Sequence, residues 1–248
     1  NNDIVGNSYG GDGVVDANHV RVFSEGTRDL ESEAEAKGIR YNGGEIDSPS
    51  RNLARFVTGL GERYLTDFHA RMIYRTDRYG RGGDQVPVLA AGFPALRLTE
   101  AKENYTREHQ NVRSENGIAY GDVIEGVDFP YLAQVARLNI VAMAALAMAP
   151  APPVVGITGA VTYDTTLSWQ PVPGASGYRA WWRDSLDPLW THSRMAGNAP
   201  SIKLEHVNID DWLFGVSSLS ADGYESPVAF PGTSGPAGAN LTAKTAPK

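Results

Sequence analysis

The chain has 248 residues, 42% of them hydrophobic and 21% charged, with a formal net charge of -7 at pH 7. This length fits one large domain or two ordinary ones, and the composition is that of a soluble globular protein. The negative charge and the lack of any Lys/Arg run argue against nucleic-acid binding. The chain has no cysteine, which excludes disulfides, thiolate metal sites and cysteine nucleophiles.

The first seven residues (NNDIVGN) read as the end of a buried strand that runs into a tight turn. In open α/β sheets, ligands and metals gather at the carboxyl ends of strands, so Asp3 occupies a position where a functional group is expected. No initiator Met or targeting segment precedes it. We therefore expect the chain to be the later part of a larger enzyme, with part of the active site lying upstream.

Helices and strands alternate in the first part of the chain. We expect strands at residues 20–23, 70–74 and 95–98, a charged helix at 27–37 capped by Thr27, a helix from 47–50 (DSPS) to Leu65, and a last helix from about Pro130 capped by Asp128. This order predicts an α/β domain whose parallel or mixed sheet is covered on both faces. The longest apolar run, residues 138–148, is too short to span a bilayer, so no membrane span is expected.

The pattern changes after a Pro-rich linker at residues 149–153 (APAPP). Short alternating segments separated by Gly, Pro and Asp turns follow, at 165–169, 177–183, 190–194, 201–204 and 212–219. This spacing predicts an all-β sandwich. We expect the Gly/Ala/Thr/Pro-rich end of the chain, residues 233–248, to be a flexible tail.

The sandwich segment resembles a fibronectin type III domain over about 80 residues. The residues that carry the resemblance are Pro152, Pro153, 167–169 (LSW), 177–179 (GYR), 214–216 (FGV) and 222–227 (DGYESP). It implies that Trp169 is buried between the sheets and that Gly223 forms the turn before the last strand. The expected division is then residues 1–149, 150–232 and 233–248.

Six short motifs in the first 150 residues resemble the C-terminal half of the catalytic domain of M28-family zinc metallopeptidases: 2–7 (NDIVGN), 76–79 (TDRY), 83–87 (GDQVP), 92–95 (GFPA), 99–100 (TE) and 108–110 (EHQ). The resemblance implies a mixed-sheet, three-layer domain of the phosphorylase/hydrolase-like kind, incomplete at its N-terminus. It also implies an aminopeptidase with two zinc ions per intact site that acts on peptides or proteins.

Position by position, the resemblance makes Asp3 a carboxylate zinc ligand and His109 the late imidazole ligand, donors that suit zinc. Asp84 would support the general base through hydrogen bonds. Tyr105 is a candidate for lining the substrate pocket. Without the resemblance, Asp3 would be a turn-capping residue and His109 a solvated loop residue.

Three departures from the family pattern bear on activity. The upstream His-x-Asp and Glu-Glu pairs, which hold the bridging ligand, a further ligand and the general base, have no counterpart here. Gln85 stands where His is usual, and Asn111 stands where Asp is usual. We therefore expect this chain to be inactive alone and to need an upstream chain that completes the site.

Several other interpretations stay open. The alternative function is a non-catalytic, degenerate peptidase scaffold used for binding or adhesion. Asp77 and Arg78 are interpreted as a surface ion pair. Trp181 and Trp182 alternate to opposite faces of one strand, so a sugar-binding platform is a minority interpretation. The expected location is secreted or periplasmic, in a bacterium.

Overall fold

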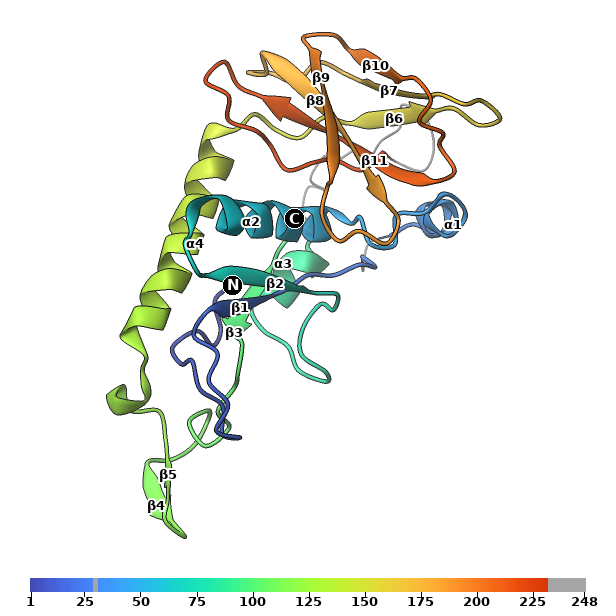
Figure 1. Cartoon of the computed structure of the whole chain (residues 1–248). Helices are drawn as coiled ribbons and strands as arrows, with labels where there is room; N and C mark the ends of the chain where they lie inside the picture. The colour runs from blue at the N-terminus through green and yellow to red at the C-terminus, as the bar shows by residue number, and fades with distance from the viewer. Residues whose placement is uncertain (29–30, 232–248) are drawn as a thin grey trace, which may run out of the picture.

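The computed structural model describes residues 1–28 and 31–231. A mixed α/β part and a β-sandwich lie one above the other, and the long helix α4 runs beside them (Figure 1). The expected tail at residues 233–248 lies outside the described residues.

A small mixed sheet organises the first part. Its strands β1 (His19–Phe23), β2 (His69–Ile73) and β3 (Arg97–Glu100) lie in the order β2-β1-β3, with β1 parallel to β2 and antiparallel to β3. The opening residues extend this sheet, because Asn2 forms a parallel bridge with Leu98 of β3. The expected mixed sheet is confirmed, and the opening segment and β3 end at the same edge.

Two helices cover one face of this sheet. Val20 and Val22 of β1 are fully buried in a core shared with α2 (Pro49–Tyr64) and α4 (Phe129–Met148). Residues between these valines point to the opposite face, because side chains alternate along a strand. The three-layer zinc-peptidase-like fold stays a prediction, since this sheet has three strands and α2 and α4 lie on one face.

Helix starts follow the expected capping chemistry in two cases. The Ser48 hydroxyl accepts a hydrogen bond from the Arg51 amide at the start of α2, and the Asp128 carboxylate accepts one from the Tyr131 amide at the start of α4. The predicted helix at residues 27–37 is wrong in its bounds. The helix there is α1 (Glu33–Asn42), and it begins after Ser32 because Ser32 and Glu35 form a capping box.

Helix α4 begins one residue before the expected start at Pro130 and includes the whole apolar run at residues 138–148. Its 20 residues are long and apolar enough to cross a membrane by length and composition. A core helix passes the same test, and one face of α4 is buried through Tyr131, Val135 and Leu138. This single helix is weak evidence, and no clear membrane span follows from it.

The sequence did not predict several short elements. They are α3 (Gln85–Ala90), the hairpin of β4 (Arg113–Glu115) and β5 (Ile118–Tyr120), and the 3-10 turn η1 (Ile124–Gly126). The hairpin and η1 lie in the connection between β3 and α4. This connection matters below because it carries His109.

The second part is a β-sandwich, as expected. Two antiparallel three-stranded sheets, β10-β7-β6 and β11-β8-β9, share one core. The strands are β6 (Val155–Thr158), β7 (Thr165–Trp169), β8 (Gly177–Asp184), β9 (His192–Gly197), β10 (Ser201–Leu204) and β11 (Trp212–Leu219). Trp169 is buried, as predicted. Gly223 has a φ of 84°, but it follows β11, the last strand of the described residues, and the segment after it pairs with β11 only through isolated bridges at Glu225 and Ala229. Strand β6 was not predicted, and β9 begins two residues later than expected.

A buried ion cluster joins the two parts. The Arg183 Nη2 atom of β8 lies 2.8 and 2.9 Å from the two carboxylate oxygens of Asp47, just before α2. Arg55 of α2 lies 2.9 Å from the same carboxylate, and its Nε donates to the Pro188 carbonyl of the sandwich. These three charged side chains are at most 2% exposed. Helix α2 is therefore fixed between the mixed sheet and the sandwich (Figure 1).

Candidate functional site

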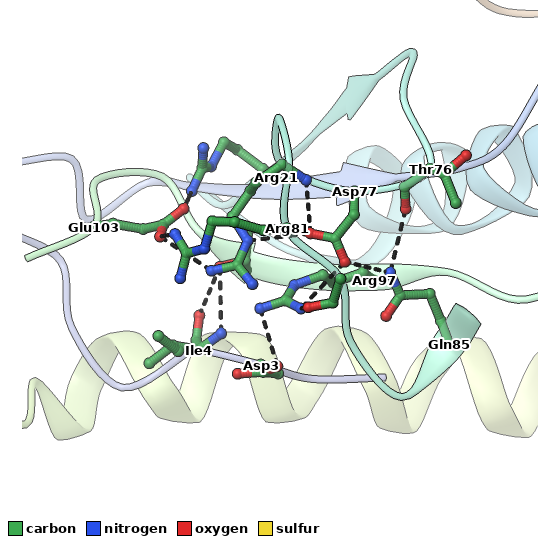
Figure 2. Close-up of polar contacts among 12 residues, drawn as sticks. Asp3, Ile4, Arg21, Thr76, Asp77, Arg81, Gln85, Arg97 and Glu103 are labelled. Carbon is green, nitrogen blue, oxygen red and sulfur yellow. Dashed lines mark hydrogen bonds and ion pairs between the residues drawn. The ribbon is translucent and has the colours of Figure 1, made fainter. Parts of the chain in front are cut away.

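Asp3 lies in the opening segment, alongside Leu98 of β3. Its amide donates to the Leu98 carbonyl at 3.0 Å, which aligns the segment with β3. Its Oδ2 atom lies 3.0 Å from the Arg97 Nη2 atom, and Arg97 is fully buried whereas the Asp3 side chain is 44% exposed. A fully buried guanidinium thus forms an ion pair with a partly exposed carboxylate (Figure 2).

The Arg97 guanidinium connects Asp3 to a buried polar network (Figure 2). Its Nη1 atom lies 3.2 Å from Asp77 Oδ2, and the Gln85 amide donates to the same oxygen at 2.5 Å. Gln85 also accepts a hydrogen bond from the Asn1 side chain at 3.0 Å. Burial alone would raise the pKa of Asp77, but hydrogen bonds from Gln85 and Arg78 outweigh it and hold that pKa below its ordinary value.

The interpretation of Asp77 and Arg78 as a surface pair is wrong. Asp77 is 7% exposed and the Arg78 side chain 8%. Asp77 is enclosed by its contacts with Gln85 and Arg97, and Arg78 also pairs with Glu103. Gln85 has a structural task here, since its amide can donate to Asp77 and accept from Asn1 at once.

Asp3 and His109 line one cavity of about 270 Å³. His109 follows β3 in the connection to α4 and adopts a left-handed φ of 52° with an exposed side chain. The opening segment and β3 run in the same direction, so the residues after both strands meet at one edge. The two sequence-predicted metal ligands are thereby brought to the same cavity.

Sequence reasoning missed three acidic residues of this cavity: Glu100, Glu108 and Asp122. Glu100 is 1% exposed and accepts a hydrogen bond from the Asn7 amide at 3.0 Å. The pKa of Glu100 is raised to about 8, mainly because the side chain is buried. The hydrogen bond from the Asn7 amide lowers this pKa, whereas the neighbouring carboxylates Glu108 and Glu103 raise it. Glu100 is therefore mostly a neutral acid at neutral pH.

The two carboxylate oxygens of Glu108 differ in their contacts. Its Oε2 atom lies 2.9 Å from the Arg81 Nη2 atom, and its side chain is 6% exposed. Its Oε1 atom is buried without a hydrogen-bond partner among residues 1–28 and 31–231. Leaving a buried carboxylate oxygen without a hydrogen-bond partner costs free energy. The signal in the sequence is its position directly before His109.

The donor types suit zinc, but the set is incomplete. Zinc takes histidine nitrogen and carboxylate oxygen, with at least three protein ligands in catalytic sites. Within the described part of the chain, no group of three or more His, Asp or Glu side chains could hold a metal ion. Asp3 and His109 therefore form a partial site at most.

The other two sequence-predicted residues lie apart from this cavity. Asp84 is exposed at the start of α3, makes no capping hydrogen bond, and is not a lining residue. Tyr105 is 66% exposed and lines a second pocket, together with several arginines. Their roles in a peptidase stay predictions.

Comparison with known proteins points to peptidases. A protein named "Probable zinc metalloprotease" from Pyrenophora tritici-repentis is 38% identical over 242 residues, which is 93% of this chain and 49% of that protein. One of the same name from Pyricularia oryzae is 40% identical over 242 residues, covering 93% of this chain and 48% of that protein. The curated relatives of this chain are named probable zinc metalloproteases. The chain spans about half their length.

No protein-family model matches the chain. Among solved structures, an Fn3-like protein from Clostridium thermocellum matches with a TM-score of 0.29 and 22% identity, covering 33% of this chain and 86% of that one. An FN3 domain of human collagen XX matches with a TM-score of 0.25 and 26% identity, covering 33% of this chain and 83% of that one.

Proposed function

We propose that this chain is part of a zinc-dependent aminopeptidase of the M28 type, which hydrolyses N-terminal bonds of peptides or proteins. The observation that carries the proposal is one cavity lined by Asp3, His109 and Glu108. The names of the relatives point the same way. Because those relatives are about twice as long, the remaining ligands and the general base would come from sequence outside this chain.

Each residue then has a definite task. Asp3 and His109 would hold zinc, with two ions in the intact site, and Arg97 would fix the orientation of the Asp3 carboxylate. Bound zinc polarises a carbonyl and acidifies water near neutral pH. Glu108 adds negative charge beside His109, and Asp84 would support the base once the missing residues are present. Alone, the chain would not hydrolyse peptides.

The proposal is tested by zinc content and hydrolysis of aminoacyl substrates, for this chain and for a longer natural form. We expect zinc and chelator-sensitive activity in the longer form, and loss of both in the variants Asp3→Asn and His109→Gln. The matched control is His69→Gln, an exposed histidine on β2 that pairs with Glu62. Equal zinc content in all four proteins would contradict the assignment.

The second candidate function is a non-catalytic scaffold that binds other molecules. It is favoured by the lack of a three-residue metal group among the described residues and by Gln85, which is used in a structural network. A longer natural form that takes up no zinc at millimolar supply would favour this candidate. A secreted or periplasmic location also stays a proposal, and cell fractionation tests it.

A further inference from the structure

A second pocket lies on the sheet face opposite α2 and α4. Its volume is about 340 Å³, and Phe23 and Ile73, the paired last residues of the parallel strands β1 and β2, form its floor. The carboxyl ends of parallel strands are where ligands commonly bind. This pocket has no lining residue in common with the Asp3–His109 cavity.

Four guanidinium groups surround the pocket, from Arg21, Arg75, Arg78 and Arg81. Three of them share one buried carboxylate, Glu103, which lies 2.5 Å from Arg21 and 3.1 Å from Arg78 and also binds Arg81 (Figure 2). Burial acts to raise the pKa of Glu103, but hydrogen bonds from Arg21 and Arg81 bring it below its ordinary value. Glu103 is therefore ionised, and its acceptor oxygens are already used.

The charges in this cluster do not cancel. Besides Glu103, Asp77 pairs with Arg78 and Glu108 pairs with Arg81. Asp77 also pairs with Arg97, which is in turn neutralised by Asp3. Among the ion pairs of the described residues, Arg75 has none. The cluster therefore carries one positive charge in excess, located at Arg75.

Aromatic rings hold the guanidinium groups in place. The Arg75 guanidinium lies 5.4 Å from the Tyr79 ring centroid, and that of Arg81 lies 6.0 Å from the Tyr105 ring centroid. Both Nη atoms of Arg81 are paired with carboxylates, whereas Arg75 has no ion pair among the described residues and can offer its N–H groups to a carboxylate in bidentate fashion. Tyr79 and Tyr105 are 88% and 66% exposed, so each ring has a large apolar surface available to a ligand.

We propose that this pocket binds a single carboxylate group carried on an apolar or aromatic body, with Arg75 as its main partner and Tyr79 and Tyr105 as the walls. One negative charge balances the excess, whereas a phosphate dianion would overcompensate it. The carboxylate could belong to an acidic residue of a peptide or to a small free acid. Arg81 joins this pocket to the other cavity, because it binds Glu103 with Nη1 and Glu108 with Nη2. The proposal does not depend on zinc or on peptidase activity.

The test is calorimetric titration of the 248-residue chain in the presence of a chelator. One arm uses N-acetylphenylalanine and its uncharged amide, and the other uses N-acetyl-Ala-Glu-Ala-amide and the matching Gln peptide. We expect at least one acid to bind about tenfold more tightly than its uncharged counterpart. The arm with the larger ratio identifies the source of the carboxylate. Equal binding of acid and uncharged analogue in both arms, or equally tight binding of inorganic phosphate, would overturn the proposal.

Variants locate the binding. Arg75→Gln should weaken binding of the acid about tenfold, and Tyr79→Leu should weaken it about threefold by removing the ring. Both side chains are exposed, so the fold should survive, and circular dichroism checks this. The matched control is Arg71→Gln, on the same face of β2 but outside the pocket and paired with Asp16. An effect of Arg71→Gln as large as that of Arg75→Gln would overturn the assignment.

Discussion

At the residue scale, Glu100 makes a pH-dependent contribution to stability that the sequence does not reveal. Its pKa is about 8 in the folded chain and 4.5 as the ordinary value. Between these values the folded state binds more protons than the unfolded state, so stability falls as pH rises from about 4.5 to about 8. The full shift corresponds to roughly 5 kcal/mol as an upper bound.

The variant Glu100→Gln tests this contribution, since its side chain can still accept the hydrogen bond from Asn7. In the chelated chain, urea unfolding at about pH 5 and about pH 8 should show a smaller loss of stability in the variant than in the unchanged protein. Histidines contribute equally to the pH dependence of both proteins, so their contribution cancels when the two losses of stability are subtracted. Identical pH dependence in both would show that Glu100 is not held neutral.

Arg97 is predicted to be the most sensitive residue of the Asp3 network. Arg97→Met removes the partner of Asp3 and leaves buried Asp77 without one of its cations, so we expect a loss of about 3 kcal/mol in unfolding free energy. Urea unfolding measures it. The control Arg71→Met removes an exposed arginine from β2 of the same sheet and should change stability by less than about 1 kcal/mol. Similar losses in both variants would contradict the role given to Arg97.

The candidate site could be predicted from the sequence only in part. Asp3 and His109 stand in recognisable motifs, and the structure brings them to one cavity. Glu100 and Glu108 could not be singled out, because their importance depends on burial and on which oxygen stays unpaired. The arginine pocket could not be predicted from the sequence either, because its excess positive charge depends on which arginines form ion pairs with Glu103.

At the element scale, the helices with strong end signals were predictable and the weakly marked elements were not. Ser48 followed by Pro49 fixes the start of α2. The predicted cap Thr27 lacks a Glu three residues later, whereas Ser32 has Glu35 there and caps α1. Strands β4 and β5 have three residues each, too short for a clear alternation.

The cap of α2 should matter more than that of α1. Ser48→Ala removes the hydrogen bond to the Arg51 amide and also the one to the Glu25 carbonyl, in a helix with eight buried residues. We expect a loss of about 1–2 kcal/mol, measured by urea unfolding. Ser32→Ala is the matched control, because α1 has no buried residue and its fraying costs the core little. An equal loss in both would contradict this difference.

At the scale of the whole molecule, the two parts depend on each other through charges that lie far apart in the sequence. Asp47 precedes α2 and Arg183 lies in β8, and no local pattern in the sequence links them. Their side chains are fully buried, and Arg55 completes the cluster. The sequence predicted both parts but not the way they are joined, because the partner of each charge is set by the packing of one part on the other.

This cluster should make the two parts unfold together. Arg183→Met removes the charge from the sandwich side and leaves Asp47 with Arg55 alone, so we expect a loss of about 3 kcal/mol and two separate transitions in scanning calorimetry. The control is Arg179→Met, on the same strand but paired with the partly exposed Glu225 at 3.4 Å. It should lower stability by less than about 1 kcal/mol and keep a single transition. One unchanged transition in Arg183→Met would show that apolar contacts, rather than the buried charges, join the two parts.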